Sequence, residues 1–214
     1  MQIQVKNVSK KFKKNYVLKN INLDFQSGKI YLLSGQNGCG KSVLLKLICG
    51  LYLPTNGEIL FDGKKYNSNS ICYSGIRALI ETPNFFPNLT GLENLKLLAK
   101  INDIITEEEI VHTLSKLNFK KFLNRKYCEY SLGTKQKLGI AQVLMESPKI
   151  IILDEPFNAL DEKTNILIRK ILIEEKEKDK IVILASHINI DFENFVDQVY
   201  YLDNGHIVKN RRNK

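Results

Sequence analysis

The segment at residues 35–42, which reads GQNGCGKS, constrains the fold of this chain more than any other feature. It follows an apolar run at residues 30–33 and precedes an apolar helical pattern at residues 44–48. A strand, a Gly-rich loop ending in Gly-Lys-Ser and a helix, in this order, form a P-loop, whose backbone N–H groups surround phosphates. We therefore expect a nucleotide site in which Lys41 reaches the β- and γ-phosphates and the Ser42 hydroxyl ligates Mg²⁺.

Two carboxylates indicate which reaction takes place on a nucleotide bound at this loop. The apolar run at residues 150–153 ends in Asp154 and Glu155. In P-loop enzymes the first acid after such a strand holds Mg²⁺, usually through water, and the second polarises a water that attacks the γ-phosphate. Taken alone, two acids after a strand also suit the start of a helix, and that alternative stays open. The Asn-Lys-x-Asp pattern that reads guanine is absent from the sequence, which argues against a GTPase.

Further motifs lie between and after these two features. Residues 130–137 read YSLGTKQK, residues 158–161 read NALD, and His187 follows the strand-like run at residues 181–185. In this order and spacing they resemble the signature motif, the D-loop and the switch histidine of ABC transporter nucleotide-binding subunits, and the resemblance covers almost the whole chain. It implies that the signature motif of one subunit closes on the γ-phosphate held by the P-loop of another, so that two ATP molecules lie in a head-to-tail pair. Ser131 also suits the start of a helix, which is compatible with that role.

The resemblance assigns the remaining site residues. An aromatic side chain stacks on adenine in the family, and Phe12 occupies that position, with Tyr16 as the alternative. Glu155 and His187 are predicted to be catalytic, and Ser42, Glu81 and Asp154 are predicted to ligate Mg²⁺. The residues predicted to bind ATP are Phe12, Gly35, Asn37, Gly38, Cys39, Gly40, Lys41, Ser42, Val43, Ser131, Gly133, Gln136 and Asp161.

Three departures from the family pattern narrow the match. Leu132 replaces the first signature glycine, Val43 replaces a common threonine, and Glu81 stands where most relatives have the Q-loop glutamine. Together with the segments ALIETP at residues 78–83 and FFPNLTGLENL at residues 85–95, they resemble the bacitracin-resistance and lantibiotic-immunity subgroup. The resemblance implies an ATPase that powers the export of an antimicrobial or other peptide.

The order of the patterns indicates an α/β fold. Strand-like runs lie near residues 2–8, 21–25, 29–34, 58–62, 76–80, 150–154, 181–185 and 198–203. Helical patterns follow residue 41 and occupy roughly residues 91–100, 107–118, 134–146 and 162–176, two of them opening with capping boxes at Thr90 and Thr106. We expect one domain over residues 1–214, with a P-loop core of mixed sheet flanked by helices and a helical subdomain inserted at about residues 84–148. The resemblance adds an N-terminal antiparallel β subdomain.

Composition bears on partners and location. No apolar run approaches the roughly 18–20 residues that span a bilayer, so the resemblance implies that a separate permease subunit forms the pore. Phe85, Phe86 and Pro87 are candidates for contacting it, or for packing within the helical subdomain. The four cysteines form no Cys-x-x-Cys pair and are expected to be reduced thiols. We therefore expect a peripheral protein at the cytoplasmic face of the membrane, paired with a second nucleotide-binding subunit, identical or not.

The formal net charge of +9 does not by itself indicate nucleic acid. The cations are mostly Lys and scattered along the chain, whereas base and phosphate readers favour Arg. We expect no nucleic-acid partner. The alternative is a soluble ABC-type ATPase acting on nucleic acid or ribosomes. The short, heptad-free stretch between Lys41 and Ser131 and the single cassette argue against it. The cargo and the direction of transport are not readable from the sequence.

Overall fold

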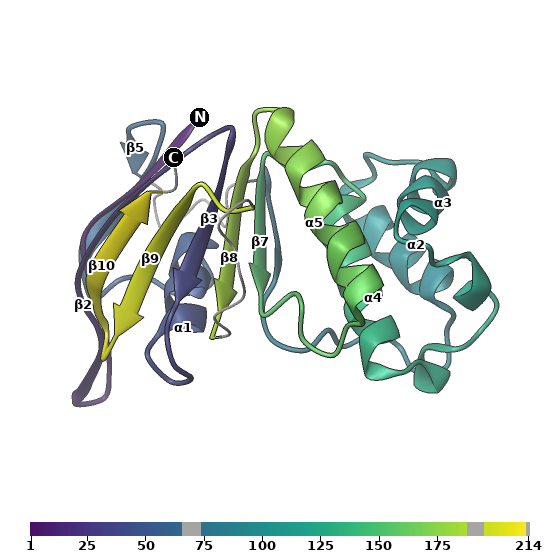
Figure 1. Ribbon diagram of the computed structural model, residues 1–214, viewed down its shortest axis with the longest axis horizontal. Helices are drawn as coiled ribbons and strands as arrows, with labels where there is room; N and C mark the ends of the chain where they lie inside the picture. The colour runs from purple at the N-terminus through teal and green to yellow at the C-terminus, as the bar shows by residue number, and fades with distance from the viewer. Residues whose placement is uncertain (66–73, 188–194, 213–214) are drawn as a thin grey trace.

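The computed structural model describes residues 1–65, 74–187 and 195–212, so Cys72 lies outside the described residues. The chain forms two sheets (Figure 1). A four-stranded antiparallel sheet has the order β2-β1-β4-β5, and a six-stranded sheet has the order β10-β9-β3-β8-β7-β6. In the larger sheet β10 is antiparallel to β9 and the other pairs are parallel, which confirms the predicted mixed sheet and antiparallel β subdomain.

The strands run over these residues: β1 Gln2–Phe12, β2 Asn15–Gln26, β3 Lys29–Ser34, β4 Asn56–Phe61, β5 Lys64–Lys65, β6 Ile76–Leu79, β7 Ile150–Asp154, β8 Ile181–Ser186, β9 Gln198–Asp203 and β10 His206–Arg212. The helices are α1 Lys41–Ile48, α2 Gly91–Asn102, α3 Glu107–Lys116, α4 Leu132–Leu144 and α5 Glu162–Glu177, with two short 3₁₀ helices, η1 Lys120–Phe122 and η2 Tyr127–Glu129.

Successive side chains of the central strands point to opposite faces of the six-stranded sheet and pack into two separate cores. In β7, Ile150 and Ile152 pack into a core shared with α1 and the four-stranded sheet. Ile151 and Leu153 point to the other face and join a core with α2, α4 and α5. Because both faces of the sheet are covered, the strand has no polar position before Asp154, as expected for a buried parallel strand. Figure 1 shows α5 beside the six-stranded sheet and α2 and α3 at the end of the molecule far from β2 and β10.

Between β6 and β7, α2 and α3 begin where the sequence predicts, and α4 begins two residues earlier than predicted. Thr90 caps α2 and Thr106 caps α3, and both capping boxes form, with Glu93 and Glu109 reaching back to the backbone. These caps satisfy N–H groups that have no partner inside the helix. Residues 84–148 thus contain α2, α3, η1, η2 and α4. That they form a separate helical subdomain stays a prediction.

Two strands were not predicted, and two are longer than predicted. β5 and β10 each follow a hairpin turn, and β1 and β2 continue past the predicted runs to pair Phe12 with Asn15. Among the described residues, no helix combines the length and the apolar character needed to cross a bilayer.

Candidate functional site

The phosphate loop connects the carboxyl end of β3 to α1. Gly38 and Gly40 have φ angles of 81° and 114°, which L side chains rarely adopt, so glycine is required at both turns. Lys41 is only 6% exposed. Its Nζ donates to the carbonyl oxygens of Gly35 at 2.7 Å and Gln36 at 3.2 Å. The ammonium is thus held inside the loop, beside the space that a phosphate would occupy.

A pocket of about 210 Å³ opens at this loop. Its lining residues are Val17, Asn37, Gly38, Gly40, Lys41, Ser42, Val43, Asp154 and Glu155. Six of the predicted ATP-binding residues and both strand-end acids therefore share one pocket. Gly35 and Cys39 do not line it: Cys39 is buried, and a Cβ built on Gly35 would lie 2.8 Å from its Sγ. Val17 was missed because nothing in the local sequence connects it to the loop.

The residues predicted to ligate Mg²⁺ are split. Ser42 Oγ donates to Asp154 Oδ2 at 2.5 Å, so a hydroxyl and a carboxylate oxygen meet at the base of the pocket. Burial raises the pKa of Asp154, opposed by the Ser42 hydrogen bond and reinforced by the nearby charge of Glu155. Oxygen donors from one or two side chains, completed by phosphate and water, fit Mg²⁺. Ser42 and Asp154 therefore fit this ion.

Glu81 does not line this pocket, although its charge is near enough to contribute to the raised pKa of Asp154. Its side chain is 66% exposed, and its Oε1 accepts from Lys46 Nζ on α1 at 2.5 Å. That hydrogen bond raises the pKa of Lys46. Glu81 also has a φ of 68°, an uncommon value for a residue with a Cβ. Its role as a metal ligand stays a prediction, and its ion pair with Lys46 was not predicted.

Glu155 is oriented by the end of the neighbouring strand, β8. Its Oε1 accepts from the His187 backbone N–H at 2.9 Å and lies 2.7 Å from His187 Nδ1, and its Oε2 accepts from Ser186 Oγ at 3.1 Å. Lys41 Nζ is 4.0 Å from Oε1. Glu155 has a φ of 48°, in the left-handed region that residues with a Cβ adopt less often. The predicted pair Glu155 and His187 is thus in contact. Ser186 was missed, although it directly precedes His187.

The aromatic candidates do not line the phosphate pocket. Phe12 lies at the end of β1, where its ring makes an edge contact with Tyr52 at 5.5 Å between centroids and lies 5.0 Å from Lys10 Nζ. Tyr16, at the start of β2, lies 5.2 Å from Lys11 Nζ. Both rings are partly exposed, Phe12 by 39%. Stacking on adenine remains a prediction for Phe12.

A second pocket, of about 270 Å³, lies at the start of α4. Ser131 caps this helix, its Oγ accepting from the Thr134 N–H at 3.3 Å, and Asp161 caps α5 in the same way through Thr164 at 2.7 Å. A Cβ on Gly133 would come within 2.5 Å of the Ala159 carbonyl oxygen, so only glycine permits this approach. Ser131, Gly133 and Asp161 all line this pocket, and their contact with ATP stays a prediction.

Gln136 is directed elsewhere. Its Nε2 donates to the backbone oxygen of Glu155 in the same chain at 3.3 Å, and it does not line the pocket at α4. The two pockets have no lining residue in common. Gln136 therefore connects the signature helix to the strand-end acids, and a direct contact with ATP stays a prediction.

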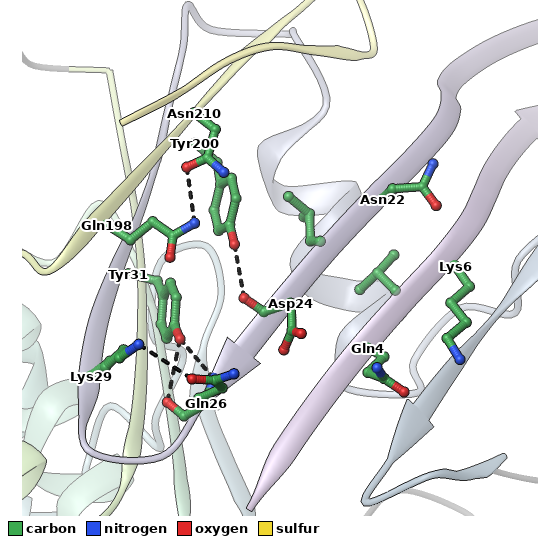
Figure 2. A pocket seen from close by; sticks show the side chains of 12 residues that line it. Gln4, Lys6, Asn22, Asp24, Gln26, Lys29, Tyr31, Gln198, Tyr200 and Asn210 are labelled. Atoms are coloured by element: carbon green, nitrogen blue, oxygen red, sulfur yellow. Dashed lines mark hydrogen bonds between the residues drawn. The ribbon is translucent and has the colours of Figure 1, made fainter. Parts of the chain in front are cut away.

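A further cavity, of about 350 Å³, is lined by none of the residues that line these two pockets. Figure 2 shows it between β1 and β2 on one side and the beginnings of β3 and β9 on the other. Its polar groups bond to each other: Tyr200 Oη donates to the Asp24 carbonyl oxygen, and Gln198 donates to Asn210. We assign it no ligand.

The mixed sheet, the loop that holds Lys41 and the carboxylates at the end of β7 define a P-loop nucleoside triphosphatase. Residues 18–158 match the family model described as ABC transporter. The chain belongs to this family as an ATP-binding subunit, and it binds and hydrolyses ATP.

Several known proteins are similar over nearly the whole chain. An uncharacterised ABC transporter ATP-binding protein, YybJ of Bacillus subtilis, is 37% identical over 96% of this chain and 94% of its own. The bacitracin transport ATP-binding protein BcrA of Enterococcus faecalis is 36% identical over 97% of this chain and 68% of its own. The lantibiotic transport ATP-binding protein SrtF of Streptococcus pyogenes is 33% identical over 96% of this chain and 89% of its own.

Solved structures agree with the fold. A dimeric bacterial ABC transporter cassette is 29% identical, with a TM-score of 0.89 over 99% of both chains. A dimeric post-hydrolysis cassette bound to ADP and Pi is 28% identical, with the same TM-score and coverage.

Proposed function

We propose that this subunit powers the export of an antimicrobial peptide through a separate transmembrane subunit. The observation that carries the proposal is the similarity, over almost the whole chain, to proteins named for bacitracin and lantibiotic transport. The sequence departures at Leu132, Val43 and Glu81 point to the same subgroup. In this proposal the subunit acts at the cytoplasmic face of the membrane.

Within one subunit, we assign binding to the P-loop and bond cleavage to the ends of β7 and β8. The loop N–H groups and Lys41 hold the triphosphate, and Phe12 stacks on adenine. Ser42 and Asp154 hold Mg²⁺, which neutralises charge on the β- and γ-phosphates when bound. Glu155 accepts a hydrogen bond from the attacking water and orients it in line with the γ-phosphate. His187 and Ser186 keep the Glu155 carboxylate in position, as their contacts with it indicate.

Two subunits are needed for a complete site in this proposal. The phosphate pocket and the pocket at α4 are separate surfaces of one chain, with no lining residue in common. A head-to-tail pair brings the α4 pocket of each copy against the P-loop of the other, so Ser131 and Gly133 close on the γ-phosphate. The dimeric cassettes among the similar structures support this arrangement.

Phe86 is the proposed contact with the transmembrane subunit. Its side chain is 64% exposed, whereas Phe85 is buried and packs on Tyr127 at 5.3 Å between ring centroids. The two neighbouring phenylalanines therefore divide the roles that the sequence left open: Phe85 packs within the helical region, and Phe86 is free to contact a partner.

The test is a gene deletion in the native host, complemented with the wild-type chain or with Glu155→Gln. Deletion should increase susceptibility to bacitracin or to a lantibiotic severalfold, and only the wild-type chain should restore resistance. Unchanged susceptibility to both peptide classes, with normal ATP hydrolysis by the purified chain, would contradict the peptide-export assignment. Copurification with ribosomes or nucleic acid in place of a membrane protein would favour the alternative function.

A further inference from the structure

The pocket at the start of α4 has a cationic wall that Ser131 and Gly133 do not account for. Lys121 from η1 and Lys137 from α4 both line it. In the described part of the chain, neither ammonium takes part in an ion pair, although other lysines such as Lys46 do. The pocket also contains Asp161, whose carboxylate accepts a hydrogen bond from the Thr164 N–H at 2.7 Å and lies near enough to both lysines for their charges to lower its pKa.

An aromatic ring holds these cations in place. Lys121 Nζ lies 5.0 Å from the centre of the Phe122 ring, Lys137 Nζ lies 5.3 Å from it, and the Arg125 guanidinium lies 6.0 Å from it. Contact with an aromatic face orients a cation without neutralising it. The geometry therefore concentrates positive charge at the rim of the pocket and leaves it available to a ligand.

The electrostatics of Lys137 agree with this geometry. Burial lowers the pKa of Lys137, and the nearby charge of Lys121 lowers it further, opposed by Asp161. The start of α4 adds partial positive charge from its free N–H groups. Two lysines and one carboxylate line the pocket, so a net positive charge is left for an anion to neutralise. A polyanion is the ligand that this pocket favours.

We propose that Lys121 and Lys137 bind the triphosphate of the ATP held by the P-loop of a second copy of this chain. The inference rests on the proposed head-to-tail pairing. It adds to that pairing two residues that contact the triphosphate directly, besides Ser131 and Gly133. Ser131, Thr134 and Lys137 recur at helical spacing and line the same pocket. A phosphate at the start of α4 therefore lies on the helix face that carries Lys137, with Lys121 facing it from η1.

The experiment measures ATP-dependent dimerisation in a Glu155→Gln background, by light scattering after gel filtration in Mg-ATP. Lys121→Gln and Lys137→Gln should each weaken the dimer by about tenfold or more, the expected effect of losing a hydrogen bond to a charged group. The affinity of the monomer for ATP should change less than about twofold. Lys137→Arg should retain dimerisation, because it keeps the charge. Lys120→Gln is the matched control, since this side chain does not line the pocket.

Two results would overturn the inference. In the first, both Gln variants dimerise as tightly as their Glu155→Gln parent. In the second, they lose monomer ATP affinity by the same factor, which would place the lysines on the nucleotide of their own chain.

If the Glu155→Gln variant itself fails to dimerise, the proposed pairing is contradicted. A second experiment then tests the role of the lysines. Tripolyphosphate is titrated into a Lys41→Ala chain, whose own phosphate loop is disabled. Binding that Lys121→Gln and Lys137→Gln reduce would support the anion site, and binding that they leave unchanged would refute it.

Discussion

Asp154 combines a functional position with a cost in stability. Burial raises its pKa, so the folded state binds this proton more tightly than the unfolded state does. The free energy of unfolding therefore falls as the pH rises from below the ordinary Asp value through the raised pKa, and stays lower at neutral pH. We therefore expect the ionised carboxylate that suits Mg²⁺ to lower the stability of the nucleotide-free protein.

We predict that Asp154→Asn raises the thermal midpoint of the nucleotide-free protein at neutral pH by about 2–4 °C, which corresponds to ~1 kcal/mol for a domain of this size. The difference should shrink as the pH falls through the raised pKa, because the wild-type carboxyl then becomes neutral as well. The variant should also lose the stabilisation that Mg-ATP gives the wild type. Melting curves over a pH series measure both effects, and a lower midpoint for Asp154→Asn at neutral pH would refute the prediction.

Gly133 is required by a close approach of backbone. A Cβ there would lie 2.5 Å from the Ala159 carbonyl oxygen, so the loop before α5 must move in any variant. Gly133→Ala should destabilise the fold by ~1–3 kcal/mol and reduce hydrolysis at least tenfold, with ATP binding to the monomer retained. Leu132→Ala, at an exposed position one residue away, is the control for helix stability. Denaturant unfolding and hydrolysis rates distinguish the two variants, and normal values for Gly133→Ala would contradict the account.

At the scale of elements, the loop after β6 is tied to α1 by one ion pair. Lys46 Nζ contacts Glu81 Oε1 at 2.5 Å, and Glu81 is mostly exposed. An exposed pair contributes little to stability, typically under ~1 kcal/mol, so its importance lies in where it holds the loop. Glu81 Oε1 already accepts a hydrogen bond from Lys46 Nζ, so Lys46 would compete with Mg²⁺ for this oxygen.

We expect Glu81→Gln to retain substantial ATPase activity and Glu81→Ala to impair coupling to transport more than nucleotide binding. Lys46→Gln serves as the matched change on the other side of the pair and should leave the folding midpoint nearly unchanged. Hydrolysis and export are measured for all three variants. An Ala variant that exports peptide normally would show that Glu81 has no coupling role.

The missed strands show what a local pattern does and does not predict. β5 follows Asp62-Gly63 and β10 follows Asn204-Gly205, and all four turn residues have positive φ. Asp-Gly and Asn-Gly are strong hairpin signals, so both hairpins were open to prediction. The strands themselves are edge strands rich in Lys, Asn and Arg, without the apolar alternation that marks a half-buried strand. Charged edges of this kind discourage pairing with other chains.

At the scale of the whole molecule, the sequence predicted the groups that are contiguous in the chain. The P-loop, the acids after β7 and the start of α4 are local motifs whose geometry follows from strand, loop and helix order. Val17 and Lys46 were missed because they reach their contacts through tertiary packing, which leaves no local pattern. Ser186 was missed although it directly precedes the predicted His187 at the end of β8. The cationic wall formed by Lys121 and Lys137 belongs to the same class, since η1 and α4 meet only in the folded chain.

The central claim is that a pair of these subunits hydrolyses ATP by means of Glu155, and Glu155→Gln tests it most directly. The amide keeps the size of the side chain but cannot accept a proton from water, so turnover should fall by about 10²-fold or more. ATP binding should persist, and the pair should accumulate in Mg-ATP. The measurement is steady-state hydrolysis together with the molecular mass in Mg-ATP and in Mg-ADP. The account predicts no measurable turnover and a dimer with Mg-ATP alone; near-normal hydrolysis by the variant would contradict it.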